Sequence, residues 1–236
     1  MPPSIRLPCG CLLREHPQTG AKYSVAKCLS HQRRMKDPKT LDQRYYQGLG
    51  SVTEAGELVP GNYLKELEDG IGHPIPPATS GAKAIEIGGG ISPYASMFVE
   101  QGYDYRLVEP SEQACTLLKT KLPGITTYPC MFPEQFPTDT THKGAYDVVF
   151  SAHSLEHMRH AINVLWHMQE LLAPKGTLYL LIPNDDDLTN PDHFWFFNED
   201  SIRKAAIICH LAVESIQVRQ IVPQEKFMYC VLKRLY

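Results

Sequence analysis

The chain of 236 residues has the length of one large domain, or of one domain with a small attachment. Apolar residues make up 43% and charged residues 21%, which excludes a disordered or collagen-like chain. The net charge is −3, and no apolar run approaches the roughly 20 residues that span a bilayer. The first residues lack the apolar stretch of a secretory signal, so we expect a cytoplasmic protein whose seven cysteines stay reduced.

The first 45 residues are basic. They hold nine Lys or Arg against three Asp or Glu, whereas the other 191 residues hold 14 basic and 23 acidic side chains. Such an imbalance indicates that this segment either meets an anionic partner or docks on the acidic remainder of the chain. Five of its basic residues could contact phosphates: Lys22, Lys27, Arg33, Arg34 and Lys36. Few aromatic residues lie between them, so binding of nucleic acid is the weaker interpretation.

Four residues of types that bind metals lie in the same segment. Cys9-Gly10-Cys11 and Cys28-Leu29-Ser30-His31 form two pairs, and the second pair has the spacing usual for tetrahedral zinc. The alternative is four unrelated residues in a loop. A bound ion would stabilise a segment that has little apolar core of its own. We therefore expect residues 1–45 to be a small zinc-knuckle-like extension that binds structural zinc.

The next segment, residues 46–81, leads into the main domain. Short helices are predicted at 42–49 and 62–68, and a linker rich in Pro and Gly follows at 72–81. We assign residues 46–81 to a helical segment and linker, and residues 82–236 to a single large domain.

Strand and helix patterns alternate in that domain. Strands are predicted at 84–87, 105–108, 125–128, 146–150, 177–182, 213–218 and 227–233, and helices at 94–101, 111–122, 161–172 and 199–209. Ser111 and Asn198 are the expected N-caps of two of these helices. The alternation predicts a doubly wound α/β fold, in which helices cover both faces of a mostly parallel sheet.

Three consecutive glycines, Gly88, Gly89 and Gly90, follow the first of these strands. Glycine lets the chain turn sharply and lets a ligand approach the backbone, although a plain strand-to-helix turn would also use it. Glu109 ends the next strand, about 20 residues further on, where a carboxylate can accept hydrogen bonds from both hydroxyls of a ribose. This second feature favours a nucleotide-binding loop.

Four motifs carry a resemblance to a known family. They are E-I-G-G-G (86–90), L-V-E-P (107–110), Y-D-V-V-F-S-A-H-S-L-E-H-M (146–158) and L-L-A-P-K-G-T-L-Y-L-L-I-P-N (171–184). In their order and spacing, residues 82–230 resemble the class I S-adenosylmethionine-dependent methyltransferases, in particular small-molecule and RNA methyltransferases with a Glu-x-Gly-x-Gly first motif. The resemblance implies a seven-stranded, Rossmann-like sheet whose last strand is antiparallel. It also implies transfer of a methyl group from S-adenosylmethionine to an O, N or C atom of an acceptor.

The resemblance further implies which residues contact the cofactor. They are Glu86, Gly88, Gly90, Glu109, Met131, Phe132 and Ser151. Glu86 and Gly88 would lie at the methionine end, Gly90 would permit close approach, and Glu109 would hold the ribose. The family usually has an acidic residue beside the adenine, whereas this chain has C-M-F-P-E at 130–134. We therefore expect apolar and backbone contacts there, with core packing of Met131 and Phe132 as the alternative.

Three histidines and one glutamate follow the fourth and fifth predicted strands. His153, Glu156 and His157 stand at i, i+3 and i+4, and would share one face of a helix that began here. His193 follows the fifth strand, and in this fold the loops after the fourth and fifth strands flank the same crevice.

Two interpretations of this group remain open. The sequence is similar to O-methyltransferases that bind a divalent ion through an E-x-x-E-H motif and a later His. Here His153 replaces the first Glu, which would favour a softer metal than Mg²⁺. In the interpretation that we favour, no metal binds at this group. His153 or His193 then acts as a general base, and His157 either packs or shares that role.

No motif identifies the acceptor or the oligomeric state. We expect a small molecule, or an acceptor of nucleotide or sugar type. The aromatic run F-W-F-F at 194–197 either walls this acceptor or, as we favour, covers the core. The alternative to an enzyme is a methyltransferase-like binding module that recognises nucleic acid or a protein through the zinc extension. The intact glycine loop and Glu109 favour the enzyme.

Overall fold

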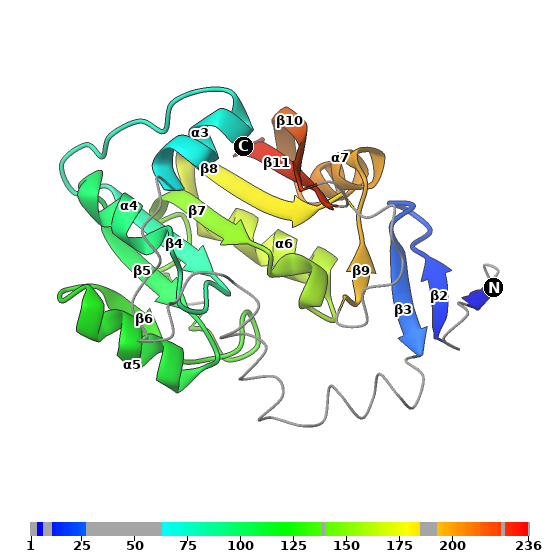
Figure 1. Ribbon diagram of the computed structural model, residues 1–236, viewed down its shortest axis with the longest axis horizontal. Coiled ribbons are helices and arrows are strands. Elements are labelled where there is room, and N and C mark those ends of the chain that lie inside the picture. Colours follow the sequence, from blue (N-terminus) through cyan, green and yellow to red (C-terminus); the bar gives the residue numbers. More distant parts are fainter. Residues whose placement is uncertain are drawn as a thin grey trace.

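The main sheet has seven strands: β4 (Lys83–Ile87), β5 (Asp104–Val108), β6 (Thr126–Tyr128), β7 (Tyr146–Ala152), β8 (Leu172–Pro183), β10 (Leu211–Val222) and β11 (Glu225–Arg234). Their order across the sheet is β10-β11-β8-β7-β4-β5-β6 (Figure 1). Strands β4 to β8 run parallel, whereas β11 is antiparallel to both β8 and β10. The predicted mostly parallel, seven-stranded α/β sheet with an antiparallel last strand is therefore confirmed. The computed structural model describes residues 4–6, 11–26, 63–137, 140–184, 193–222 and 225–235.

Helices cover both faces of this sheet. They are α3 (Tyr63–Ile71), α4 (Ala95–Glu100), α5 (Glu112–Lys121), α6 (Ala161–Leu171) and α7 (Glu199–Ile208). Leu67, Phe98 and Leu118 belong to one buried cluster, so α3, α4 and α5 pack on one face. Leu165 and Ile202 belong to the other cluster, so α6 and α7 pack on the opposite face. Within the described ranges, no helix is long and apolar enough to cross a bilayer.

Two predicted boundaries are wrong, and close packing explains one of them. The helix expected to end before Gly70 continues to Ile71 as α3. A Cβ added at Gly70 would lie 2.2 Å from the Tyr229 ring, so this glycine admits a neighbour instead of ending the helix. The second error concerns residues 173–176, which lie between the predicted helix at 161–172 and the predicted strand at 177–182 but belong to β8.

A second sheet joins the N-terminal strands to the segment after β8. Strands β1 (Ser4–Arg6), β2 (Leu12–Glu15) and β3 (Lys22–Ala26) pair in series, and β3 then pairs with β9 (Trp195–Phe196). These three N-terminal strands were not predicted, because strands of three to five residues show little periodicity. Of the four predicted zinc ligands, Cys11 is buried before β2. Cys9, Cys28 and His31 lie outside the described residues, as does the helix predicted at 42–49.

The aromatic run at 194–197 covers the core, as the favoured interpretation states. Trp195 and Phe197 belong to a buried cluster, with 6% and 1% of their surface exposed. The ring of Tyr23 in β3 stacks on Trp195 with the ring centroids 5.1 Å apart. This run therefore attaches the small sheet to the main domain.

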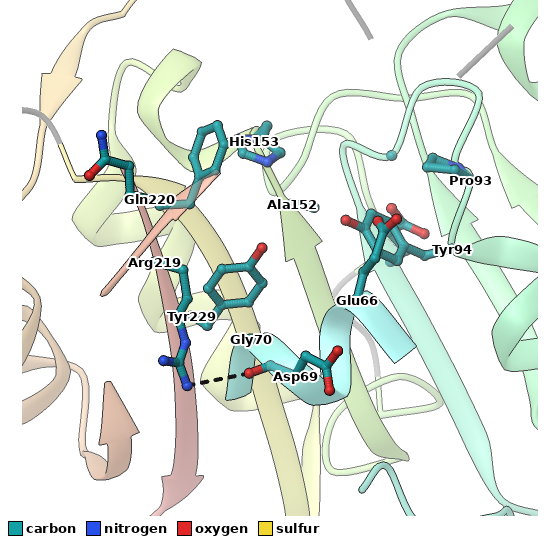
Figure 2. A pocket seen from close by; sticks show the side chains of 13 residues that line it. Glu66, Asp69, Gly70, Pro93, Tyr94, Ala152, His153, Arg219, Gln220 and Tyr229 are labelled. Carbon is teal, nitrogen blue, oxygen red and sulfur yellow. Dashed lines mark hydrogen bonds between the residues drawn. The ribbon is translucent and has the colours of Figure 1, made fainter. Parts of the chain in front are cut away.

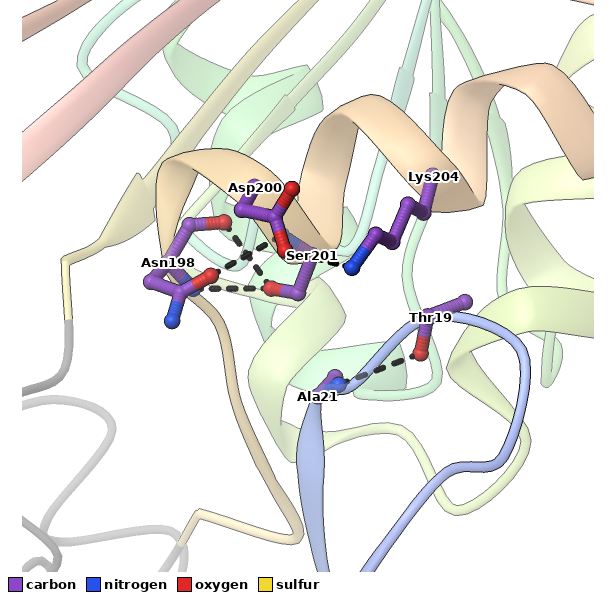
Figure 3. Close-up of polar contacts among 6 residues, drawn as sticks. All are labelled: Thr19, Ala21, Asn198, Asp200, Ser201 and Lys204. Atoms are coloured by element: carbon purple, nitrogen blue, oxygen red, sulfur yellow. Dashed lines mark hydrogen bonds and ion pairs between the residues drawn. The ribbon is translucent and has the colours of Figure 1, made fainter.

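Both expected N-caps are present. Ser111 accepts a hydrogen bond from the Ala114 amide at the start of α5. At α7, Asn198 Oδ1 accepts from the Ser201 amide at 2.9 Å, and Ser201 Oγ accepts from the Asn198 amide at 2.8 Å (Figure 3). The turn that contains Thr19 passes beside this helix, since a Cβ on Gly20 would lie 4.0 Å from Lys204 Nζ.

Candidate functional site

A cavity of about 870 Å³ opens where the parallel strands end (Figure 2). The glycine loop after β4 and the end of β7 contribute Glu86, Gly89 and His153 to its wall. Helix α3 and strands β10 and β11 contribute further lining residues: Glu66, Asp69, Arg219, Phe227 and Tyr229. Cavities of this size suit small-molecule ligands.

The glycine loop is held in a conformation that requires glycine. Gly88 and Gly90 have φ angles of +72° and +56°. The Gly88 amide donates to Val108 O at 2.8 Å, which fixes the loop to β5. A Cβ added at Gly88 would lie 1.9 Å from Ser154 Oγ, so the loop also packs tightly against the segment after β7. Neither the backbone angle nor the available space admits another residue at position 88 without rearrangement.

Glu109 lies against this loop, as the spacing of the motifs predicts. Its Oε2 accepts a hydrogen bond from the Gly90 amide at 2.9 Å, and its Oε1 accepts from the Ser111 amide at 2.9 Å. The residue is 6% exposed. Burial raises the pKa of Glu109 above its ordinary value, although the two amides that donate to the carboxylate act in the opposite direction. The carboxylate thus connects the glycine loop to the start of α5.

Glu86 is a buried carboxylate in the cavity wall, with 1% of its surface exposed. Its Oε2 accepts hydrogen bonds from Ser92 Oγ at 2.7 Å and from the hydroxyl of Tyr105. Burial raises the pKa of Glu86 to about 7 despite these two donors, and the nearby Glu109 acts in the same direction. Ser92 and Tyr105 were not predicted as site residues.

Of the seven expected cofactor contacts, Glu86 lines the cavity, whereas Gly88, Gly90, Glu109, Met131, Phe132 and Ser151 do not. Met131 is 51% exposed. Phe132 is buried against Phe136, with the ring centroids 5.6 Å apart. Ser151 is fully buried, and its Oγ donates to Ile87 O at 3.0 Å, which links β7 to β4.

No α-helix begins at His153, yet the polar residues of this segment come together. Residues Leu155–His157 form one 3₁₀ turn, and His153 precedes it with a φ angle of +50°. Nδ1 of His153 lies 4.0 Å from Glu156 Oε1, and Nε2 of His157 lies 3.8 Å from the same oxygen. The tight turn therefore brings both imidazoles to one carboxylate.

His193, which follows β8 in the chain, lies at the same place, as expected from the fold. The Phe194 amide donates to Glu156 O at 2.8 Å, and the rings of His157 and His193 are 4.9 Å apart. Glu156 and His193 are buried, and His157 is half-buried. One donor atom from each of these three residues lies within 4.8 Å of the other two, so the group is a candidate metal site.

His153 is the histidine of this group that lines the cavity. Its ring meets the Phe227 ring edge-on, with the centroids 4.6 Å apart. Burial lowers the pKa of His153 to about 4, and the nearby His193 acts in the same direction. The imidazole is therefore neutral at neutral pH, where it can accept a proton only as a weak base.

Sequence analysis missed the cavity wall formed by α3, β10 and β11. Arg219 donates to the backbone oxygen of Asp69 at 3.4 Å, across 150 residues of chain (Figure 2). It also donates to Gln217 Oε1. The charged residues on the exposed face of α3 and on the edge strand β10 form no sequence motif. Only the folded topology places them together.

A family model described as a methyltransferase domain matches residues 62–216. No curated protein matches the sequence. The structure is similar to that of 1,6-didemethyltoxoflavin-N1-methyltransferase from Burkholderia thailandensis, which was crystallised with 1,6-didemethyltoxoflavin and S-adenosylhomocysteine. The match has 12% identity and a TM-score of 0.61, and covers 98% of this chain and 99% of that one.

Two further solved structures are similar. A TehB-like S-adenosylmethionine-dependent methyltransferase from Corynebacterium glutamicum matches at 16% identity and a TM-score of 0.56, over 83% of this chain and 97% of that one. An S-adenosylmethionine-dependent methyltransferase from Mesorhizobium loti matches at 14% identity and a TM-score of 0.56, over 73% and 96%. At these identities the likeness establishes the fold.

Proposed function

The chain belongs to the methyltransferase-domain family, and from this premise we propose that it transfers a methyl group from S-adenosylmethionine to a small-molecule acceptor. The observation that carries the proposal is the contact between Glu109 Oε2 and the Gly90 amide, 2.9 Å apart. It joins a carboxylate suited to a ribose diol with a glycine loop that a ligand can approach. The S-adenosylhomocysteine bound to the Burkholderia enzyme supports the same donor.

The residues around the glycine loop fit the methionine end of this donor. A Cβ added at Gly89 would lie 2.6 Å from Glu86 Oε1, so glycine leaves that oxygen accessible beside the loop. Since Ser92 and Tyr105 both donate to the other oxygen, Oε1 is the one that we assign to the ammonium group of the donor. A charge-assisted hydrogen bond of this kind orients as well as binds.

S-adenosylmethionine supplies an activated methyl group on a positively charged sulfur. The main task of the protein is therefore to hold the acceptor atom in line with that group. An acceptor that must lose a proton needs a base, and we assign this role to His153 because it is the imidazole in the cavity wall. We propose transfer to an O, N or C atom of this acceptor. The volume of about 870 Å³ supports a small molecule, including one of nucleotide or sugar type.

The test of the donor site is Glu109→Gln. Glutamine keeps an acceptor oxygen for one of the two backbone amides, turns its NH₂ group toward the other, and removes the charge that ribose hydroxyls would meet. We expect S-adenosylmethionine to bind about 30-fold more weakly, which corresponds to about 2 kcal/mol for lost hydrogen bonds to a charged group. Calorimetry measures this, with Glu112→Gln on the exposed start of α5 as the matched control. Wild-type affinity in a folded Glu109→Gln variant would refute the assignment.

We also propose that Cys9, Cys11, Cys28 and His31 bind one structural zinc ion per chain. The C-x-C and C-x-x-H spacing supports this set. Elemental analysis of protein purified without chelator should find about one zinc per chain. The double variant Cys9→Ser/Cys28→Ser should lose that ion. Protein without zinc, or an unchanged zinc content in the double variant, would contradict the proposal.

A further inference from the structure

A carboxylate and two imidazoles converge beside the cavity, and the geometry points to a second metal site there. In contrast to the metal-free interpretation favoured from the sequence, we propose that Glu156, His157 and His193 bind a divalent transition-metal ion. Their three donor atoms lie within 4.8 Å of one another, and Glu156 and His193 are both buried. The site differs in residues and in chemistry from the Cys/His set near the N-terminus.

The backbone holds these residues in place. The amide of His157 donates to Ser154 O at 3.0 Å, which closes the 3₁₀ turn that carries Glu156 and His157. The amide of Phe194 donates to Glu156 O at 2.8 Å, which positions the adjacent His193. The site therefore joins the loop after β7 to the segment that leads into β9.

The distances suit a bound ion after small side-chain rotations. Nε2 of His157 and Oε1 of Glu156 are 3.8 Å apart. Ligands at about 2.0–2.2 Å from a tetrahedral ion are separated by roughly 3.4 Å. The three donor atoms, which lie within 4.8 Å of one another, would have to move closer together to bind one ion, and rotation of the imidazole rings provides such a movement.

The donor set selects the class of metal. Two imidazole nitrogens and one carboxylate suit zinc, iron, cobalt or manganese, whereas Mg²⁺ and Ca²⁺ prefer oxygen ligands. Three protein ligands also leave a coordination position open to water or to a further ligand. Metal binding at this site does not depend on the proposed function. Any role of the metal in methyl transfer would rest on the proposed function.

His153 separates this site from the cavity. It lines the cavity, and its Nδ1 lies 4.0 Å from Glu156 Oε1. In the E-x-x-E-H motif of the metal-dependent O-methyltransferases, a Glu stands where this chain has His153. His153 is not one of the three converging donors. An ion held by the other three would thus lie one side chain away from the cavity.

The experiment is a Co²⁺ titration of the full-length protein after treatment with chelator. Cobalt that binds to cysteines adds thiolate-to-metal charge-transfer absorption, whereas cobalt on nitrogen and oxygen adds only d–d bands. We expect one equivalent of the second kind. His193→Ala and the shape-preserving Glu156→Gln should weaken that equivalent at least about 100-fold, since even outer-shell changes cost 10–100-fold. The exposed neighbour His160 provides the matched control, His160→Ala, in which binding should be unchanged.

The outcomes separate this proposal from the proposed function. Absence of a nitrogen- and oxygen-bound equivalent, or an equivalent that persists in both His193→Ala and Glu156→Gln, overturns the metal site. Either result would mean that Glu156, His157 and His193 form a carboxylate–imidazole network without metal. Calorimetry with S-adenosylhomocysteine on the same samples reports the donor site independently. Cobalt binding without S-adenosylhomocysteine binding would refute the proposed function and leave the metal site standing.

Discussion

At the scale of single residues, Glu86 combines burial with a position in the cavity wall. Its pKa of about 7 reflects desolvation that the hydroxyls of Ser92 and Tyr105 only partly offset, together with the nearby Glu109. A bound cation favours the ionised carboxylate and lowers this pKa. Binding of S-adenosylmethionine below pH about 7 should therefore release a proton, and affinity should rise with pH until the free carboxylate is ionised.

Glu86→Gln tests this linkage. Isothermal calorimetry in two buffers of different ionisation enthalpy counts the protons released on binding. We expect the wild type to release up to about one proton per chain near pH 6, and Glu86→Gln to release fewer because its side chain does not titrate. Glu100→Gln, at the exposed end of α4, should behave as the wild type does. Equal proton release by the Glu86→Gln variant and the wild type would show that another group titrates.

Sequence analysis identified the carboxylates of this site but not their partners. Glu109 was predictable because the distance from a glycine loop to the end of the next strand is set by one strand–helix–strand unit. Tyr105 lies inside β5 and has the pattern of a core residue, and its contact with Glu86 depends on how β4 and β5 pair. Hydrogen bonds between neighbouring strands leave no local signal.

At the scale of elements, the turn between β4 and α4 can be tested by an alanine substitution at Gly88, with Gly81, which precedes β4, as the comparison. Gly81 and Gly88 have similar φ angles of +80° and +72°. Alanine at Gly81 would meet nothing within 4 Å, so only the backbone cost of about 1–2 kcal/mol applies. Alanine at Gly88 would also clash with Ser154, for which overpacking adds about 1–3 kcal/mol.

Urea unfolding of Gly81→Ala and Gly88→Ala measures this difference in the free energy of unfolding. Only Gly88→Ala should also weaken S-adenosylmethionine binding, because it displaces the glycine loop. Equal losses of stability in the two variants would mean that the segment after β7 moves aside easily. The tight contact between Gly88 and Ser154 would then have no part in holding the loop.

The histidine group shows where spacing alone misleads. An i, i+3, i+4 pattern fits an α-helix, yet His153 adopts a left-handed conformation and only one 3₁₀ turn follows. The side chains converge all the same, since a single tight turn brings residues three apart together. The pattern therefore predicted the proximity of these residues correctly, although a 3₁₀ turn and not an α-helix brings them together.

At the scale of the whole molecule, the alternation of strands and helices was enough to predict the main sheet. Three of the four connections between the parallel strands join neighbouring strands, and only the one from β6 to β7 crosses the sheet, so that right-handed crossovers leave few alternatives. The small sheet could not be predicted, because β3 pairs with a two-residue strand about 170 positions later in the chain, with Tyr23 opposite Trp195. The same holds for the cavity wall in which α3 meets β10 and β11 (Figure 2).

The most direct test of methyl-donor binding in this cavity is a crystal structure of the protein with S-adenosylhomocysteine. We expect both ribose hydroxyls within hydrogen-bond distance, about 2.6–3.2 Å, of the Glu109 carboxylate. The methionine end should lie at Gly88–Gly90 with its ammonium group on Glu86, and the sulfur should face the space next to His153. A ligand bound elsewhere, or a cavity that stays empty at saturating S-adenosylhomocysteine, would contradict this assignment.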